Sequence, residues 1–370
     1  MSRKASLAKK IAHTLMAMSI VYSSGINIVV NEVYAAEKTK DITSSDPYFS
    51  EESKNGNGYD VSGGITDGED ISLTGKVTEA DLSDKSIVVL ASGGKGGDDN
   101  GSSPTTMQGS NGGDAAAKIT IDESFSNVTL GKLRASSYSG LDGSAYQGAA
   151  GNIGAATAYG LQLKHDLTIS VADIEVEAKS GWDTLNYRGY SYSTVGGAAG
   201  PQALAVGVQF DGGKVEFSGT KLNIEAMGAK INECRASSEE ATGGGTTEAY
   251  GFRVQDGEAT IALSDSIKIN LSGTDGQSFD SIHLGTVNGF AGGDGGEIAG
   301  FGIESNGGST NLDIKDIEID NEDHSYWSSY YGQGGTGQSV DGSKGDLVAG
   351  SGGRGANATG VEVSILPAAV

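Results

Sequence analysis

The chain has few of the residues that usually crosslink a fold or break its backbone pattern. It has 1 cysteine and 4 prolines among 370 residues. A lone cysteine, Cys234, excludes an internal disulfide framework, so stability has to come from packing. Glycine is abundant, with 60 residues. The scarcity of proline nevertheless argues against the disordered class that is rich in both residues.

Positive charge and catalytic signatures are also scarce. The chain has 25 basic against 48 acidic residues, a formal net charge of −23, which disfavours nucleic acid and anionic membranes as partners. The 4 histidines stand at unrelated positions. The nucleophile elbow Gly-x-Ser-x-Gly, the zinc motif His-Glu-x-x-His and Cys-x-x-Cys do not occur. The sequence therefore predicts that the protein is not an enzyme.

The N-terminus has the features of a targeting segment. It begins with four basic residues: Arg3, Lys4, Lys9 and Lys10. An apolar stretch from Leu15 to Val30 follows, and Val33 and Ala35 fit positions −3 and −1 of signal-peptidase cleavage after Ala35. We expect residues 1–35 to be a signal peptide, residues 36–60 a flexible linker and residues 61–370 the folded domain of an exported protein.

A short pattern, glycine followed by apolar-x-apolar, recurs along the chain. Its copies are Gly160-Leu161-Gln162-Leu163, Gly207-Val208-Gln209-Phe210, Gly251-Phe252-Arg253-Val254, Gly302-Ile303-Glu304-Ser305 and Gly360-Val361-Glu362-Val363. The intervals between copies are unequal, so a segment of variable length is inserted in each unit. Recurrence of this kind is typical of repeat architectures.

Two further alternating runs follow each of the first four copies, as in Leu167-Thr168-Ile169 and Ile174-Glu175-Val176. Alternation with period two in β-branched residues predicts short strands with one buried face. Three such strands give roughly 20 residues, the size of one coil of a β-solenoid. The sequence predicts an all-β, right-handed parallel β-helix with long glycine-rich loops between coils; an antiparallel sandwich is the alternative.

The glycine-rich loops carry two aromatic clusters. These are Trp182, Tyr187, Tyr190 and Tyr192 in one loop and Tyr326, Trp327, Tyr330 and Tyr331 in another. Aromatic rings interleaved with glycine and serine are typical of recognition loops, which makes these residues the candidate binding site. The alternative is that the loops fold back and pack on the coils.

Two glycine-rich stretches partly match the calcium-binding repeat Gly-Gly-x-Gly-x-Asp. They end at Asp98 and Glu297, and the second also contains Asp294. That repeat binds calcium when successive copies share ions, whereas here the copies are single. We expect no cofactor. The one candidate is calcium bound at Asp98, Asp294 and Glu297, and the alternative is that these stretches are plain glycine-rich turns.

Together, the signal peptide, the acidic glycine-rich repeats and the near absence of cysteine resemble the passenger domains of bacterial autotransporters (type V secretion). That resemblance implies a pectin-lyase-like right-handed β-helix on the surface of a Gram-negative bacterium, often an adhesin or biofilm factor associated with virulence. Such passengers are carried through the outer membrane by a C-terminal translocator barrel, and no strands of that kind are present in residues 61–370. The last repeat, Val361 to Leu366, looks incomplete, so we expect a reading frame that is truncated before its barrel.

The functional expectation is a secreted or cell-surface structural or adhesive protein. Its glycine-rich aromatic loops would contact a host surface protein or a glycan. Two alternatives stay open, an exported polysaccharide-active enzyme on the same coils and a truncated passenger remnant without function.

Overall fold

The computed structural model describes most of the region in which strands are expected. The described residues are 37–56, 66–97, 110–141, 151–181, 203–228, 245–273, 298–306, 309–320 and 358–359. They belong to one compact unit, Val33–Val370. They contain no helix of the length and apolarity that crossing a membrane requires.

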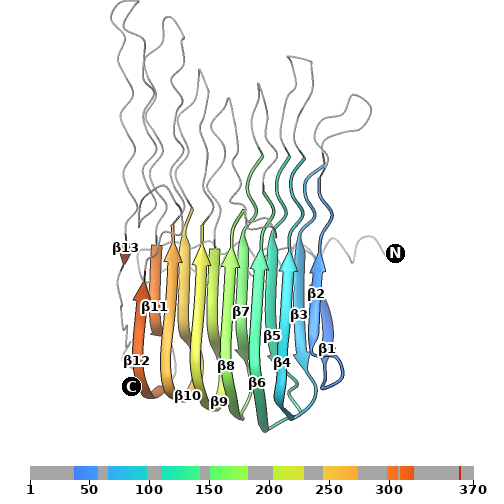
Figure 1. Ribbon diagram of the computed structural model, residues 1–370. Coiled ribbons are helices and arrows are strands. Elements are labelled where there is room, and N and C mark those ends of the chain that lie inside the picture. Colours follow the sequence, from blue (N-terminus) through green and yellow to red (C-terminus); the bar gives the residue numbers. More distant parts are fainter. Residues whose placement is uncertain are drawn as a thin grey trace, which may run out of the picture. The chain divides into compact units, whose positions relative to one another are not determined.

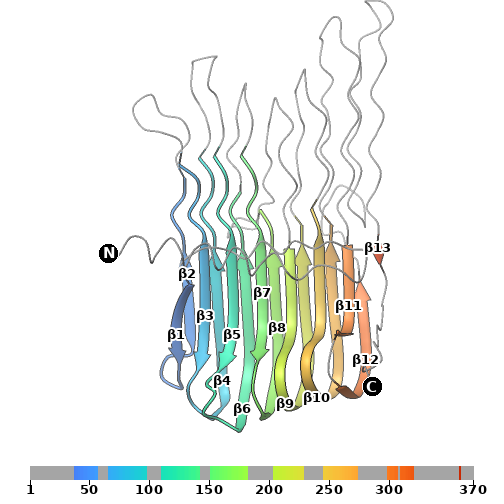
Figure 2. The ribbon, with the colours of Figure 1, turned by 180° about the vertical axis from the view of Figure 1, so that it is seen from behind.

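The described residues form a sheet of 13 strands (Figures 1 and 2). The strands are β1 Glu37–Ile42, β2 Tyr48–Glu52, β3 Ile71–Val77, β4 Asp81–Ser92, β5 Ala115–Ile121, β6 Asn127–Tyr138, β7 Ala156–Leu163, β8 Leu167–Lys179, β9 Ala203–Met227, β10 Thr247–Ser272, β11 Ile298–Ser305, β12 Ser309–Asp320 and β13 Ala358–Thr359.

Every strand pair in the sheet is parallel, and each strand pairs with strands of the neighbouring coils. This is the topology of a right-handed parallel β-helix, which confirms the predicted fold and excludes the antiparallel sandwich. The residue separation between paired strands varies because the inserted loops vary, while the strands keep their register apart from local shifts.

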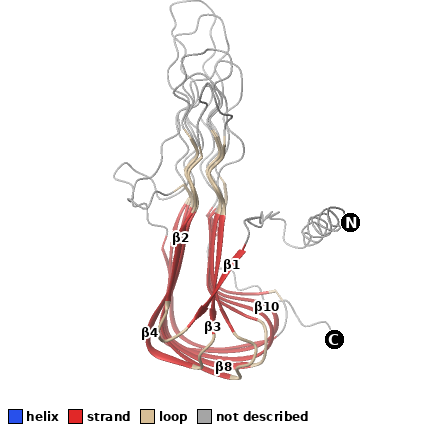
Figure 3. Ribbon diagram, turned by 90° about the vertical axis from the view of Figure 1, so that its right-hand side faces the viewer, coloured by secondary structure: helices blue, strands red, loops and turns tan. Residues whose placement is uncertain are grey.

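Each coil has two limbs, which Figure 3 shows joined at a curved base. The descending limb consists of β1, β3, β5, β7, the first part of β9 and of β10, and β11. The ascending limb consists of β2, β4, β6, β8, the remainder of β9 and of β10, and β12. The two limbs of every coil meet the inter-coil segments at the same edge of the sheet.

The expectation of three short strands per coil is wrong in detail. Both β9, with 25 residues, and β10, with 26, run continuously around the whole coil. The corners persist as register shifts, between Val254 and Glu258 and between Leu263 and Ile267. Parallel pairing to the neighbouring coil survives the bend, so the strand is not interrupted there. At the first corner, Gly213 and Gly257 have φ of 77° and 89°, a conformation that favours glycine.

The core consists of ladders of equivalent apolar side chains in successive coils. One ladder on the ascending limb is Ile87, Leu133, Ile174, Leu222, Ile267 and Ile317. Its members from Ile87 to Ile267 are at most 1% exposed. Because no coil can bury these side chains alone, stacking of coils supplies the core.

The recurring glycines lie against side chains of the ascending limb. A Cβ atom on Gly160 would be 2.6 Å from Cγ2 of Ile174, and one on Gly251 would be 2.9 Å from Cγ2 of Ile267. Any side chain here would collide with the ascending ladder, which explains the glycine of the repeated pattern. The pattern lies within a strand and not at its start, because β7 begins at Ala156, before Gly160.

The described part of the segment expected to be a linker, residues 37–56, contributes two strands to the folded sheet. Within residues 36–60, β1 pairs with β3 and β2 pairs with β4. Both Ile42 and Phe49 are buried in the core. The strong charge of Glu37–Ile42 suits the edge strand of a sheet, where charged side chains deter pairing with other chains. Because these residues are charged, β1 lacks the apolar alternation from which strands were predicted.

Candidate functional site

The eight predicted aromatic contact residues lie outside the described residues. The same is true of the calcium candidates Asp98, Asp294 and Glu297. What the structure does describe is the base of several of the loops. The candidate functional site is therefore built from these bases and from the outer faces of the two limbs.

The loop bases are extended segments rich in glycine, called here the glycine arms. The ascending row comprises residues 53–56, 93–97, 139–141 and 180–181; the descending row comprises 66–70, 110–114 and 151–155. Figure 3 shows the arms, in tan, as two rows that continue the two limbs of the sheet. Every described arm therefore leaves the coils at one edge.

Backbone hydrogen bonds join the two rows of arms. The N–H of Gly113 donates to the carbonyl of Gly94 at 2.7 Å, that of Gly140 to Gly113 at 2.8 Å, and that of Gly154 to Gly140 at 3.1 Å. These residues alternate between the descending and the ascending row. The bonds cross between the limbs, unlike those of the sheet, so the arms form one hydrogen-bonded body.

Successive N–H groups of one arm point in three directions. Gly93 donates to Tyr138 in the next coil, Gly94 to Glu69 in the facing row, and Lys95 to the Asn55 side chain in the previous coil. Gly96 then donates to the next coil again. A period of three residues is that of the polyproline II conformation, which makes no internal hydrogen bonds and leaves all its backbone groups for neighbours.

Glycine is required in the arms because the arms of successive coils lie so close together within each row. A Cβ atom on Gly94 would be 1.9 Å from the carbonyl oxygen of Lys54, and one on Gly140 would be 1.9 Å from that of Gly94. A Cβ atom on Gly113 would be 2.2 Å from the oxygen of Glu69. All three obstacles are backbone atoms, which cannot rotate away. The glycines that the sequence assigns to loops are, at these bases, a packing requirement.

Aspartate and asparagine side chains add bonds along the descending row. The Oδ1 atom of Asp70 accepts from the N–H of Asp114 at 2.8 Å, and Oδ1 of Asp114 accepts from that of Ala155 at 2.7 Å. The pKa of Asp114 is raised, mainly by burial and also by the charge of Asp70. The hydrogen bond from the N–H of Ala155 lowers the pKa but does not outweigh these two effects. Each side chain thus fixes the same backbone position one coil further on.

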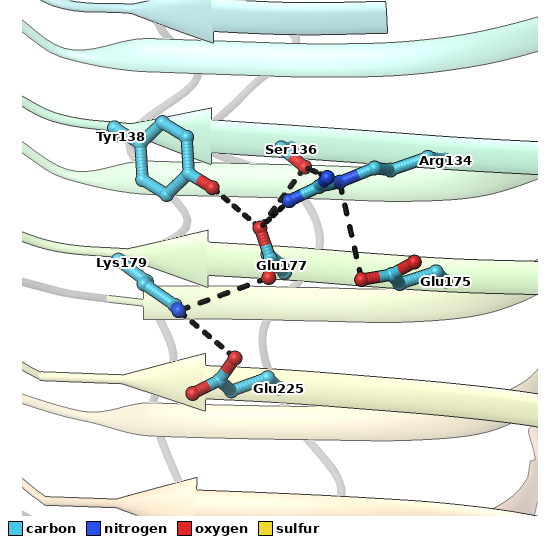
Figure 4. A network of polar contacts seen from close by, with 7 residues as sticks. All are labelled: Arg134, Ser136, Tyr138, Glu175, Glu177, Lys179 and Glu225. Atoms are coloured by element: carbon cyan, nitrogen blue, oxygen red, sulfur yellow. Dashed lines mark hydrogen bonds and ion pairs between the residues drawn. The ribbon is translucent and has the colours of Figure 1, made fainter. Parts of the chain in front are cut away.

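The outer face of the ascending limb carries a polar network centred on Glu177 of β8 (Figure 4). Its Oε2 atom accepts hydrogen bonds from Arg134 Nη2 at 2.9 Å, from Ser136 Oγ at 3.2 Å and from the hydroxyl of Tyr138. These three donors lie on β6, one coil earlier. Charge-assisted bonds of this kind are stronger than neutral ones.

The network continues into a third coil. Lys179 Nζ lies 2.9 Å from Glu225 of β9 and 3.8 Å from the other oxygen of Glu177, and Arg134 Nε is 3.9 Å from Glu175. Burial alone would raise the pKa of Glu177, but the Tyr138 hydrogen bond and the charges of Lys179 and Arg134 outweigh it and lower the pKa. An ionised carboxylate with its acceptor sites filled is suited to tying coils together and poorly suited to donating a proton.

A second cluster, on the outer face of the descending limb, is apolar. Leu204, Val206 and Tyr250 are buried there, with Tyr159 and Phe301 packed against them. The rings of Tyr250 and Phe301 stack with centroids 4.9 Å apart. This cluster was not predicted, because alternation assigns the outward positions of a strand to polar residues.

Polar side chains fix the central ring of that cluster. The Arg253 guanidinium lies over the Tyr250 ring, 4.5 Å from its centroid, and its Nε is 2.8 Å from Glu304. The Tyr250 hydroxyl donates to Glu248 at 2.9 Å. Burial, followed by the charge of Glu248, raises the pKa of Tyr250, so the hydroxyl stays protonated.

Among the described residues, no group of three or more histidine, cysteine, aspartate or glutamate side chains is placed to hold a metal ion. The described part of the first calcium candidate, Gly93 to Gly97, is engaged in the arm hydrogen bonds. The described glycines of this candidate are therefore accounted for by the contacts between arms.

Comparison with protein-family models, with curated proteins and with solved structures gives no match for this chain. The fold and the arrangement of the arms are accordingly the basis for a functional proposal.

Proposed function

We propose that the protein is an exported scaffold that displays its loops from the surface of a Gram-negative bacterium, as the passenger of an autotransporter does. The stack of coils provides rigidity, and the loops beyond the glycine arms contact a glycan or a host surface protein. The observation that carries the proposal is that every described arm leaves the coils at one edge, in two hydrogen-bonded rows. Loops held side by side can bind together even if each contact is weak.

The aromatic clusters are the proposed contact residues. Trp182 and Trp327, with their tyrosine neighbours, offer amphipathic contact area at low entropic cost. Surface localisation is supported by the signal-peptide pattern of residues 1–35. The translocator barrel, as a partner on a further C-terminal part, is proposed from the resemblance alone.

The test is binding of the purified protein to a glycan array and to host-cell surface proteins. We expect binding that is lost when Trp182, Tyr187, Tyr190 and Tyr192, or Tyr326, Trp327, Tyr330 and Tyr331, are replaced by alanine. Tyr48→Ala is the matched control, because Tyr48 is an aromatic residue of the described sheet that is 54% exposed. Binding that survives both loop variants would refute the proposed contact residues, and no binding to either panel would refute the display function.

A polysaccharide-active enzyme is the second candidate. The observation that favours it is the position of Glu177 and Glu225 on successive coils beside Arg134 and Lys179 (Figure 4), because glycoside cleavage uses paired carboxylates. In this candidate Glu225 would be the proton donor, and Glu177 would act in its ionised form. Release of reducing ends from glycans, abolished by Glu177→Gln, would establish this function. Binding without product release favours display.

A further inference from the structure

The two ends of the described coil stack differ. At the first coil, charged side chains join β1 to the residues that follow it: Lys38 pairs with Glu51, and Lys40 Nζ lies 2.7 Å from Asp46 and donates to the carbonyl of Tyr48 at 2.8 Å. These contacts cross the end of the core, where Ile42 is fully buried. The first coil is thus closed by ion pairs.

The coil of β11 and β12 exposes its apolar residues. Leu312 and Ile317 of β12 are 47% and 37% exposed, whereas their register partners in β10, Ile261 and Ile267, are 1% and 0% exposed. Within the described part of the chain, β12 pairs with β10 alone. Among the described residues, the outer edge of β12 therefore combines unpaired backbone groups with exposed apolar side chains, the combination that recruits another strand.

Charge on the same strand limits which strand can bind. The residues that alternate with the apolar ones include Asp313, Asp316, Glu318 and Asp320, with Lys315 as the one basic residue of β12. On the occupied side, Lys268 of β10 lies 2.6 Å from Glu318, its register partner. A strand added on the open side meets the same acidic row, so a basic residue is the complementary neighbour.

We infer that the open edge of β12 binds an extended segment of another polypeptide in which apolar and basic residues alternate. The segment adds as the next strand, with its apolar side chains on Leu312 and Ile317 and its basic side chains beside Asp313 and Glu318. Main-chain bonds supply affinity and the alternation supplies specificity. A second copy of β12 is a poorer occupant. If two β12 strands paired antiparallel with their apolar residues opposite each other, Asp313 of one strand would face Glu318 of the other, and the two negative charges would repel.

The test uses a fluorescein-labelled peptide of alternating valine and lysine, with binding to the full chain followed by anisotropy. Two control peptides replace lysine by glutamate or group the same residues in blocks. Ile317→Lys and Leu312→Lys place a charge at the edge and are each expected to weaken binding about tenfold or more. Tyr48→Lys changes an exposed residue of the first coil and is expected to leave binding unchanged.

Hydrogen exchange gives a readout independent of these substitutions, because the added peptide should protect amides of β12 and leave those of β1 unchanged. Equal binding of a control peptide, protection confined to β1, or unchanged affinity in both lysine variants would overturn the inference. So would self-association that Ile317→Lys abolishes, since the occupant would then be a second copy. Peptide binding that appears only after removal of residues 360–370 would also overturn it, by assigning the edge to the chain's own segment.

Discussion

The N–H of Gly94 donates a 3.0 Å hydrogen bond to the carbonyl oxygen of Glu69 in the facing row of arms. The two residues belong to different limbs, so this bond links segments that the sheet does not pair. Gly113 then donates to Gly94 at 2.7 Å, and the same relationship passes from coil to coil. Removal of one glycine should therefore disturb several arms.

Gly94→Ala is expected to destabilise the arms by about 1–3 kcal/mol, the usual cost of forcing an added methyl group into a packed site. The new Cβ would be 1.9 Å from the Lys54 oxygen, so the backbone has to move. Hydrogen exchange of residues 66–70 and 93–97 should accelerate. Gly219→Ala is the control, because its closest contacts are the ends of the Leu263 and Phe217 side chains at 3.1 Å. Equal effects of the two substitutions would contradict the close packing of the arms.

Glu177→Gln is expected to lower stability by about 2 kcal/mol, because hydrogen bonds to charged groups contribute roughly 1.5–3 kcal/mol each and glutamine keeps part of the geometry. The variant leaves Arg134 and Lys179 near each other without the central carboxylate. Thermal unfolding followed by circular dichroism measures the change. Glu175→Gln, at a half-exposed carboxylate with one 3.9 Å contact, should change stability by less than about 0.5 kcal/mol.

The contribution of Glu177 should depend on pH in a defined direction. Its pKa is lower in the folded protein than its ordinary value of 4.5, so the unfolded chain takes up the proton first as the pH falls. The stabilisation is complete above pH 4.5 and is lost as the pH falls through the lowered pKa. The Tm difference between the wild type and Glu177→Gln should shrink over that range; a constant difference would show that the ionised carboxylate is not the source.

Asp114 should show the opposite sign. Burial raises its pKa in the folded protein, so its charged form costs stability, and this cost grows as the pH rises through the raised pKa. Asp114→Asn keeps an oxygen for the Ala155 N–H and removes the charge beside Asp70. We expect a higher Tm at neutral pH and an advantage that disappears in acid. A lower Tm at neutral pH would mean that the charge itself is needed.

Arg253→Lys is expected to cost about 1 kcal/mol, although it keeps the charge, because lysine replaces a planar group that stacks on Tyr250 and bonds to Glu304. Chemical denaturation measures the loss. Lys268→Met is the matched control, since its ion pair with Glu318 is about half exposed and should contribute less than about 0.5 kcal/mol. A larger loss at Lys268 than at Arg253 would refute this ranking.

The coils were predictable from the sequence because burial on one face of a strand leaves period two in residues such as Ile174 and Val176. The glycine arms were not, because Gly94 and Gly113 act through backbone groups that leave no side-chain pattern. The sequence signal that could have revealed them is the repeated Asp-Gly or Asn-Gly before a strand, as at Asp67-Gly68 and Asn111-Gly112.

The Glu177 network depends on register, which places Glu177 beside Ser136 across an inserted loop. Loop lengths differ between coils, so spacing in the sequence does not give that register. The outward cluster at Tyr250 breaks the usual alternation, and the Arg253 guanidinium, paired with Glu304, covers the Tyr250 ring. Strand β1, within the segment expected to be a linker, was not predicted because charged residues replace the apolar alternation there. Charged residues of this kind are common in edge strands.

The parallel ladders also have a mechanical consequence. Because each ladder bond joins one coil to the next, a pulling force on one end of the described chain would load the bonds of a single coil at a time. The coils should then peel off in sequence at low force, each releasing its own loop as a step of different length. A force applied along the strands between β4 and β6, which pair in neighbouring coils, would instead load many bonds at once and meet much greater resistance.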